Sequence, residues 1–473
     1  MMRHLRLLAL LAPALLLPVA CEDSSTSPAT PFTFEAGPGF EAGPPAEAGP
    51  LPDAGDIDAA DVFVPPVPKG VTVSVIDGLT GKANVRVISH DATGAVIGDA
   101  KTDATGKVVM ATAPSIVTVL TTANSSSFPV TFFAVADGDN LVVRVPSIAV
   151  EQAPIGQYSV TITPPATAPI AAVVAGNGCS GTTSDTSAPI LVDLLPNCVG
   201  ATNAVLADGS DLNGGRVGFA FKKGVAKPAA AAPAVDVVLN AWTAPGDTKL
   251  TVLNTPPSSS LAGDLYMIAN GAAFPVYGST GLLDEGGRHF ATATGFAEAY
   301  QSSIQANSSA SGRFAETAIV RRAATTAPAT LVLPDVDMAG ALPLITAAAI
   351  DSTTPARPVV TLTSGALTAV DGGYASLTWL DATDTTATWT FVLPPSAVAT
   401  FTVPALPADA ASFAPVAQTT IGDAVFFEAT QVPGYKETKA FPVTPRTRLD
   451  LLNTSLPLPA DGIVRITLLG PLG

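Results

Sequence analysis

The sequence has few charged, aromatic, histidine and cysteine residues for its length of 473. Charged residues make up 13% and aromatic residues 6%, and there are three histidines and three cysteines. With 23 basic against 39 acidic residues, the chain lacks the clustered Lys and Arg that bind a nucleic-acid backbone. It also contains no metalloprotease, serine-hydrolase or phosphate-loop motif. We therefore expect no nucleic-acid partner and no enzymatic activity. A Ser-His-Asp arrangement around His289 is the remaining catalytic alternative.

Long apolar runs are missing as well. After residue 21 the longest, at 168–176 and 342–350, are about nine residues, half of what a membrane-spanning helix needs. The 43 prolines and 40 glycines argue against long helices. The hydrophobic fraction of 47% and the mean hydropathy of +0.40 argue against a largely disordered chain. Together these features predict an all-β body built of several domains.

The first 20 residues predict a signal peptide. Arg3, His4 and Arg6 form a basic start, and residues 7–19 form an apolar stretch too short to span a bilayer. Leu17, Val19, Ala20 and Cys21 then resemble the lipobox of bacterial lipoproteins, although Pro18 stands where that pattern usually has Leu. The resemblance implies lipidation of Cys21, with the membrane as partner and the outer membrane as location. Ordinary cleavage that leaves Cys21 as a free thiol is the alternative.

The three cysteines fit this interpretation. Cys179 and Cys198 are 19 residues apart in a chain expected to be exported, which predicts one disulfide between them. Cys21 is then left over, and attachment to lipid accounts for it.

A spacer is predicted over residues 21–69. Residues 22–68 hold nine acidic residues, ten Pro and five Gly but no Lys or Arg, and Glu-Ala-Gly-Pro recurs every six residues. Such a segment buries too little apolar surface to order itself, and like charges and Pro extend it. We expect a disordered acidic Pro/Ala/Gly tether that holds the body away from the lipid surface, although neutral low-complexity drift gives the same composition.

The clearest strand pattern lies in residues 70–146. Val71, Val73 and Val75 alternate with polar residues, and the tetrad Asp-Ala-Thr-Gly occurs at 91–94 and 103–106. Asp begins such turns and Gly supplies the positive φ that closes them. Residues 102–107 resemble the turn signature of carboxypeptidase regulatory-like and bacterial Ig-like domains. The resemblance implies a seven-stranded antiparallel β-sandwich that serves as a spacer or adhesion module, and it supplies no catalytic residue.

The rest of the chain is expected to continue as tandem β-sandwich (Ig-like) domains. We predict a second, disulfide-containing sandwich over 147–245, a β-rich domain over 246–330 and a C-terminal β-rich domain over 331–473. A long hairpin is expected from residues 290–304 to 313–322, and a helix over 296–304 is the alternative. A β-propeller over 147–473 is a further alternative, without a visible blade repeat.

A few polar and aromatic residues are candidates for binding. Asp208, Ser210, Asp211 and Asn213 offer clustered oxygens suited to structural calcium. The turn Asp137-Gly138-Asp139-Asn140 is a weaker candidate of the same kind, and for both groups a plain turn is the alternative. Among the tryptophans, Trp379 and Trp389 have the parity of core positions, whereas Trp242 lies at a strand end and could stack on a ligand.

From the sequence we expect a non-catalytic cell-envelope lipoprotein that displays β-sandwich modules for adhesion, spacing or envelope organisation. Its partner would be an envelope protein or a glycan. The alternatives are a glycan- or calcium-binding surface module and, more remotely, a hydrolase on a sandwich scaffold.

Overall fold

The computed structural model describes residues 70–470 with internal gaps. The gaps are residues 79, 111–113, 124–125, 146–153, 166–169, 179, 185–188, 196–201, 229–232, 257–258, 277–287, 311–312, 325–329, 368, 383, 396–399 and 444–457. Strands make up 60% of the described residues and helices 5%, which confirms the all-β prediction. No helix in the described part of the chain is long and apolar enough to cross a membrane.

The first sheet contains the strand in which valines alternate. In β1 (Val71–Asp77) the side chains of Val71, Val73 and Val75 are fully buried, while the residues between them are partly exposed. Because successive side chains of a strand point to opposite faces, this alternation gives the sheet one core face. Its other strands are β2 (Thr80–Gly81), β5 (Lys107–Met110) and β8 (Asn140–Arg144), and β8 runs parallel to β1.

Both predicted Asp-Ala-Thr-Gly turns form with the same geometry. The Oδ1 atom of Asp103 accepts from the backbone N–H groups of Thr105 and Lys107 at 2.8 and 3.0 Å, and Asp91 accepts in the same way from Thr93 and Ala95. The closing glycines at 94 and 106 have φ of 79° and 78°. The turn at 91–94 closes the antiparallel pair of β3 (Arg86–His90) and β4 (Val96–Lys101), as expected. The turn at 103–106 closes no hairpin, because it leads from β4 to β5, which pairs with β1 in another sheet.

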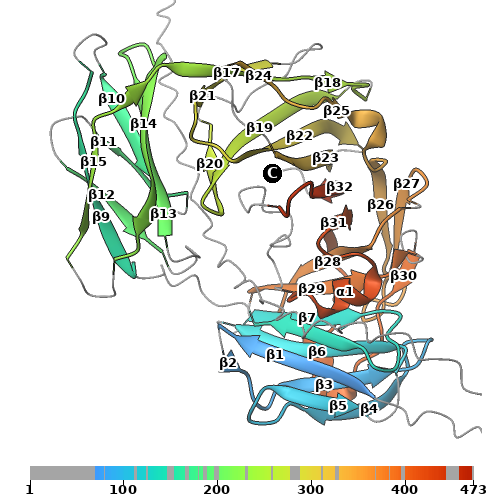
Figure 1. Cartoon of the computed structure of the whole chain (residues 1–473). Coiled ribbons are helices and arrows are strands. Elements are labelled where there is room, and N and C mark those ends of the chain that lie inside the picture. Colours follow the sequence, from blue (N-terminus) through green and yellow to red (C-terminus); the bar gives the residue numbers. More distant parts are fainter. Residues whose placement is uncertain are drawn as a thin grey trace, which may run out of the picture.

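A twelve-stranded sheet forms most of the molecule and runs from the top to the bottom of Figure 1. In order across the sheet, its strands are β20 (Ala272–Pro275), β19 (Ser260–Ala269), β22 (Ala299–Ala310), β23 (Arg313–Ala324), β32 (Ile463–Gly470), β31 (Thr420–Ala429), β28 (Gly372–Leu380), β29 (Thr386–Leu393), β7 (Ser126–Phe132), β6 (Ile116–Ala123), β3 (Arg86–His90) and β4 (Val96–Lys101). The β29–β7 pair is parallel and the other neighbours are antiparallel.

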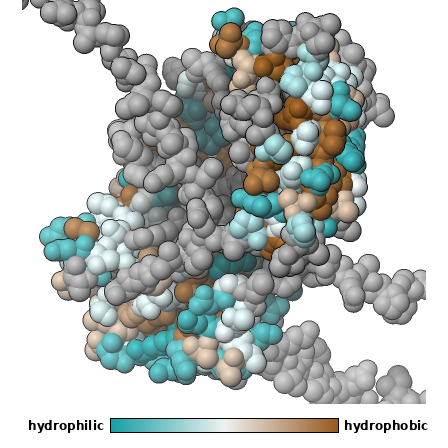
Figure 2. Space-filling model, turned by 90° about the vertical axis from the view of Figure 1, so that its left-hand side faces the viewer, coloured by the Kyte–Doolittle hydropathy of each residue, from teal (hydrophilic) through white to brown (hydrophobic). Residues whose placement is uncertain are grey.

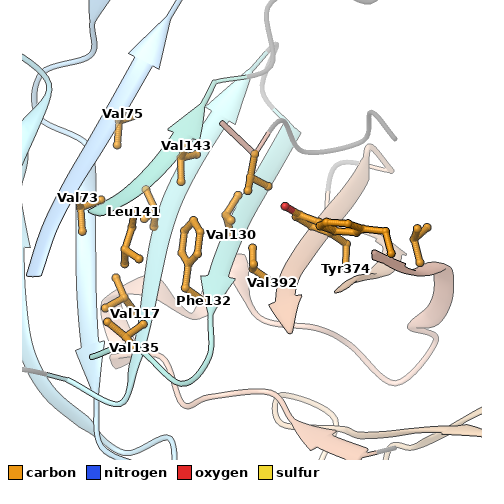
Figure 3. Packing of buried hydrophobic residues seen from close by; sticks show 14 of the residues in the cluster. Val73, Val75, Val117, Val130, Phe132, Val135, Leu141, Val143, Tyr374 and Val392 are labelled. Carbon is orange, nitrogen blue, oxygen red and sulfur yellow. The ribbon is translucent and has the colours of Figure 1, made fainter. Parts of the chain in front are cut away.

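This sheet crosses two of the expected domain limits. Strands from residues 70–146, 246–330 and 331–473 lie side by side in it, so hydrogen bonding does not stop at residue 146 or 330. The reason is that β7 offers a free edge, and β29 pairs with that edge from Thr390 to Val392. Residues far apart in the sequence thereby enter one core. Val130 and Leu141 pack in the same hydrophobic cluster as Val392, Phe427 and Ile466, part of which Figure 3 shows.

The second sandwich, by contrast, keeps sheets of its own, on the left of Figure 1. One sheet has the order β12 (Ile190–Leu194), β9 (Gly156–Ile162), β15 (Val235–Leu239). The other has the order β11 (Gly181–Ser184), β10 (Ala172–Gly176), β13 (Thr202–Ser210), β14 (Arg216–Ala226), β16 (Trp242–Thr243). A separate core, which includes Tyr158, Val192 and Val205, fills the space between them.

Smaller sheets pack against the large sheet and share two of its hydrophobic clusters. They comprise β21 (Arg288–Ala293), β17 (Pro245–Leu250) and β24 (Thr330–Val332); β18 (Val252–Leu253) with β25 (Val336–Asp337); and β26 (Ile345–Asp351), β27 (Val359–Ser364) and β30 (Thr400–Thr402). The helices that lie wholly within the described residues are α1 (Tyr435–Ala440) and the 3-10 helices Met338–Gly340 and Ala408–Phe413. The predicted long hairpin is β22–β23, so the helix over 296–304 is wrong. The strand expected over 290–304 is interrupted by a turn at 294–296.

A chain of buried polar side chains crosses four strands of the large sheet. The indole N–H of Trp389 donates to Thr131 Oγ1 at 2.8 Å, Thr131 Oγ1 lies 2.9 Å from Thr118 Oγ1, and Thr118 Oγ1 lies 3.0 Å from His90 Nε2. Because an indole N–H can only donate, Thr131 Oγ1 is the acceptor of the first bond. Each threonine hydroxyl both accepts and donates when Thr131 donates to Thr118 and Thr118 donates to His90 Nε2. His90 Nε2 is then the acceptor, which needs a neutral ring. Burial lowers the pKa of His90 to about 4 and keeps the ring neutral.

Candidate functional site

A cluster of hydrogen-bonded polar residues lies where the predicted tether meets the body. At the first described residue, the Gly70 N–H donates to Asp137 Oδ1 at 2.7 Å, and the Thr72 N–H donates to the Asp139 carbonyl at 2.9 Å. Both aspartates belong to the turn between β7 and β8 that the sequence marked as a weak calcium candidate. The first residues of β1 are thus bonded to this turn.

The Asp139 side chain faces a lysine 300 positions further along the chain. Lys439 Nζ forms an ion pair with Asp139 Oδ2, and both side chains are 4% exposed. The carboxylate also accepts from the Ala136 N–H at 2.8 Å, and the ammonium donates to the Ala134 carbonyl at 3.0 Å. The Tyr435 ring completes the surroundings, with its centroid 4.8 Å from Nζ. We call Asp137, Asp139, Tyr435 and Lys439 the Asp139–Lys439 junction.

Helix α1 is held in place on its other side by Asp371. The Asp371 carboxylate accepts from the backbone N–H groups of Ala429 and Gly434, each at 2.7 Å. Burial raises the pKa of the Tyr435 hydroxyl well above its ordinary value. That hydroxyl lies 2.7 Å from the Phe133 carbonyl and 3.0 Å from the Val392 carbonyl. These bonds fix Lys439 against the turn that carries Asp139, with little freedom for either side chain.

The calcium candidates in the second sandwich do not converge on one site. Asp208 lies on β13, 4% exposed, with its Oδ2 3.0 Å from Arg216 Nε. Asp211 accepts from the backbone N–H groups of Asn213 and Gly215, both at 2.8 Å, in the geometry of the turns at Asp91 and Asp103. Ser210 Oγ lies 3.5 Å from the Ala172 carbonyl. In the described residues, no three His, Cys, Asp or Glu side chains are placed to hold a metal ion.

The burial of Asp208 makes a pH dependence predictable. Burial raises the pKa of this carboxyl to about 7, although Arg216 opposes the shift, and Oδ1 is buried without a hydrogen-bond partner. Between an unfolded pKa near 3.8 and a folded pKa near 7, the folded state binds more protons. Stability should therefore fall as pH rises from about 4 to 7.

We expect Asp208→Asn to remove the part of this fall in stability that Asp208 causes. Urea unfolding of the full chain at pH 5 and pH 8 measures it. Asp211→Asn is the matched control, because Asp211 is a partly exposed turn residue three positions away, and it should leave the difference in stability between the two pH values unchanged. An unaltered difference in Asp208→Asn would contradict the assignment.

Trp242 is partly buried rather than free. Its indole N–H donates to the Thr163 carbonyl at 2.8 Å, and its ring lies over Gly209, where an added Cβ would come within 2.9 Å of ring carbon Cζ3. The ring also packs on the core of the second sandwich. In the sheet β12–β9–β15 of that sandwich, Leu191 and Val238 are each about half exposed. Figure 2 shows the left-hand side of the molecule, on which hydrophobic and hydrophilic residues are mixed. Trp379 and Trp389 are buried, as their parity predicted.

His289 meets an acid at the surface. It lies on β21 opposite β17, with Nδ1 2.8 Å from Asp247 Oδ1. The two side chains are 62% and 49% exposed. This is two thirds of the arrangement that the hydrolase alternative needs, and the contacts of His289 include no hydroxyl nucleophile among the described residues.

Several predicted features fall outside the described residues: the signal peptide, Cys21, the tether to residue 69, Cys179 and Cys198. Lipidation and the disulfide therefore stay predictions. Lys439, Tyr435 and Asp371 were not predicted as site residues from the sequence. The Gly before Tyr435 and the Asp-Gly-Gly at 371–373 are local signals of turns near these residues. Nothing in the sequence links those turns to Asp139.

Comparison with known proteins gives no family. No protein-family model matches the sequence, and no curated protein matches it. Among solved structures, the Bacillus anthracis TIE protein is 9% identical with a TM-score of 0.14, over 57% of this chain and 50% of that one. A streptococcal ancillary pilin is 8% identical with a TM-score of 0.14, over 56% and 98%. The chain thus spans about half the length of the first of these, and scores this low carry no argument.

Proposed function

We propose that this protein is a non-catalytic lipoprotein of the cell envelope. Cys21 anchors it to the outer membrane, residues 22–69 hold the body away from the lipid, and the β-sandwich body serves adhesion, spacing or envelope organisation. The proposal combines the N-terminal sequence with an all-β body. It treats Trp242 and the carboxylates of the second sandwich as structural residues and leaves the partner, an envelope protein or a glycan, to be identified.

One observation carries the proposal: the start of β1, where the predicted tether joins the body, is hydrogen-bonded to the neighbouring turn and to β8. A body on a tether is pulled at residue 70, along β1. Five residues of β1 pair in parallel with β8, so a pull along the strand loads several backbone hydrogen bonds at once. The bonds from Gly70 to Asp137 and from Thr72 to Asp139 reinforce the same end of β1. This arrangement suits a module that transmits force between the membrane and a partner.

The test is the membrane association of Cys21→Ala. We expect the wild-type chain in the membrane fraction, and the variant released into the soluble fraction, because a lipid anchor contributes about 0.8 kcal/mol per buried methylene. The double variant Cys179→Ala/Cys198→Ala is the matched control, since it removes two thiols and keeps Cys21, and should stay with the membrane. Cys21→Ala protein that remains membrane-bound would rule out the anchor.

Digestion of whole cells with an added protease then decides which side of the outer membrane carries the body. Degradation of the wild-type body in intact cells places it outside, and protection places it in the periplasm.

A further inference from the structure

We propose that Lys439 and Asp139 become joined by an intramolecular amide bond between Lys439 Nζ and Asp139 Cγ. The bond would link α1 to the turn between β7 and β8. The structure places the two groups in direct contact, 4% exposed each, in the Asp139–Lys439 junction. The proposal goes beyond the proposed function and does not depend on Cys21.

The positions of both groups are fixed independently of each other. The Ala136 N–H holds Asp139 Oδ2, and the Asp139 carbonyl accepts from the Thr72 N–H. On the other side, the Ala134 carbonyl and the Tyr435 ring hold the ammonium, and Asp371 holds the start of α1. The buried ammonium and carboxylate are therefore held in contact within one molecule, which is the condition for a high effective concentration of the two groups.

The reaction is a condensation and needs no oxidant, reductant or leaving group other than water. A proton passes from Nζ to Oδ2, which gives the amine and the carboxylic acid. The nitrogen lone pair attacks Cγ, the C–O bond to the protonated oxygen breaks, and water leaves with that oxygen and two hydrogens. The products are one amide and one water molecule, and the two starting charges disappear together.

Two physical terms favour the amide in this place. Well-oriented groups in one molecule reach effective concentrations of roughly 10⁵ to 10⁸ M, far above the concentration of water at about 55 M, which drives hydrolysis. In addition, a buried ion pair bears a desolvation penalty of several kcal/mol per ion, and neutralisation removes that penalty.

The chain contains a pair of the same residue types that lacks these conditions. Lys82 Nζ lies 2.9 Å from Asp77 Oδ2, but the two side chains are 50% and 38% exposed. Water surrounds this pair, so we expect it to remain an ion pair. It serves as an internal control for chance reactivity between Lys and Asp.

The test is peptide mapping of the purified full chain by mass spectrometry. Trypsin cuts after Lys107, Arg144, Lys436 and Arg446, and an amide at Lys439 prevents cleavage there. We expect a branched product of residues 108–144 and 437–446, lighter than the sum of the two peptides by one water, about 18 Da. Normal cleavage after Lys82 should be seen in the same digest.

Free peptides 108–144 and 440–446 as the main products of the wild-type chain would overturn the proposal. The control is Lys439→Arg, which keeps the positive charge but presents a guanidinium that does not form the amide under these conditions, and it should give only unbranched peptides. The wild-type measurement decides the matter even if that variant fails to fold. It is also independent of membrane association, so it and the Cys21 experiment can fail separately.

Discussion

Replacing Lys439 by methionine is expected to lower the free energy of unfolding by about 3–5 kcal/mol. Methionine keeps most of the length of the side chain but leaves the Asp139 carboxylate, 4% exposed, without its cation. An uncompensated buried charge is costly, because the interior cannot replace the water that it has lost. Urea unfolding of the full chain at neutral pH, followed by far-ultraviolet circular dichroism, measures the change.

A double variant separates the ion pair from the proposed amide. Lys439→Met/Asp139→Leu removes both charges, and apolar replacements of a buried pair are often neutral or stabilising. Recovery of most of the lost stability is expected if only an ion pair forms. If the amide forms, the double variant also loses a cross-link between positions 300 residues apart, and it stays destabilised.

Lys82→Met is the matched control for this series. The Lys82–Asp77 pair is half exposed, and such pairs contribute about 0–1 kcal/mol. A loss in Lys439→Met no larger than in Lys82→Met would contradict the structural role of the junction.

Replacing Trp389 by alanine is expected to cost about 3–5 kcal/mol. The side chain is fully buried, stacks on Phe391 with ring centroids 5.4 Å apart, and donates to Thr131 across the β29–β7 pair. This pair is the hydrogen-bonded connection between the N-terminal strands and the C-terminal strands of the large sheet. The variant should therefore loosen that connection, which hydrogen exchange of β7 and β29 would detect.

Two further variants distinguish volume from hydrogen bonding. Trp389→Phe keeps an aromatic ring but removes the indole donor, and Thr131→Val removes the acceptor and leaves that donor buried. We expect Thr131→Val to cost about 1–3 kcal/mol, because an unsatisfied buried donor bears its full desolvation penalty. If Trp389→Ala unfolds at the same midpoint urea concentration as the wild type, Trp389 does not stabilise the connection between the N-terminal and the C-terminal strands.

Local patterns predicted the strands well, for a physical reason. The period-two valines of β1 and the Asp-Ala-Thr-Gly turns depend on neighbours within a few residues, so the sequence carries their signal directly. The β22–β23 hairpin also followed from local spacing.

The contacts of the candidate binding residues were not predicted, because the partners of a side chain are not set by its neighbours in the sequence. Asp208 and Asp211 are three positions apart, yet one faces Arg216 in the sheet and the other closes a turn. Asp139 was noted for its neighbours in the turn, while its decisive contact is Lys439, 300 residues away. No spacing rule in a single sequence relates positions so far apart.

By itself the sequence determined the all-β class of the body and the position of most strands. Export and the tether are proposals that rest on the sequence alone. The class and the strands follow from composition and short-range periodicity, which act through the backbone of each segment. Only the tertiary structure decided that strands from three expected domains form one sheet and that Lys439 meets Asp139. The sheet depends on which strand pairs with the edge of β7, and the ion pair depends on which side chain meets the buried Asp139. Both are decided by the packing of segments that are far apart in the sequence.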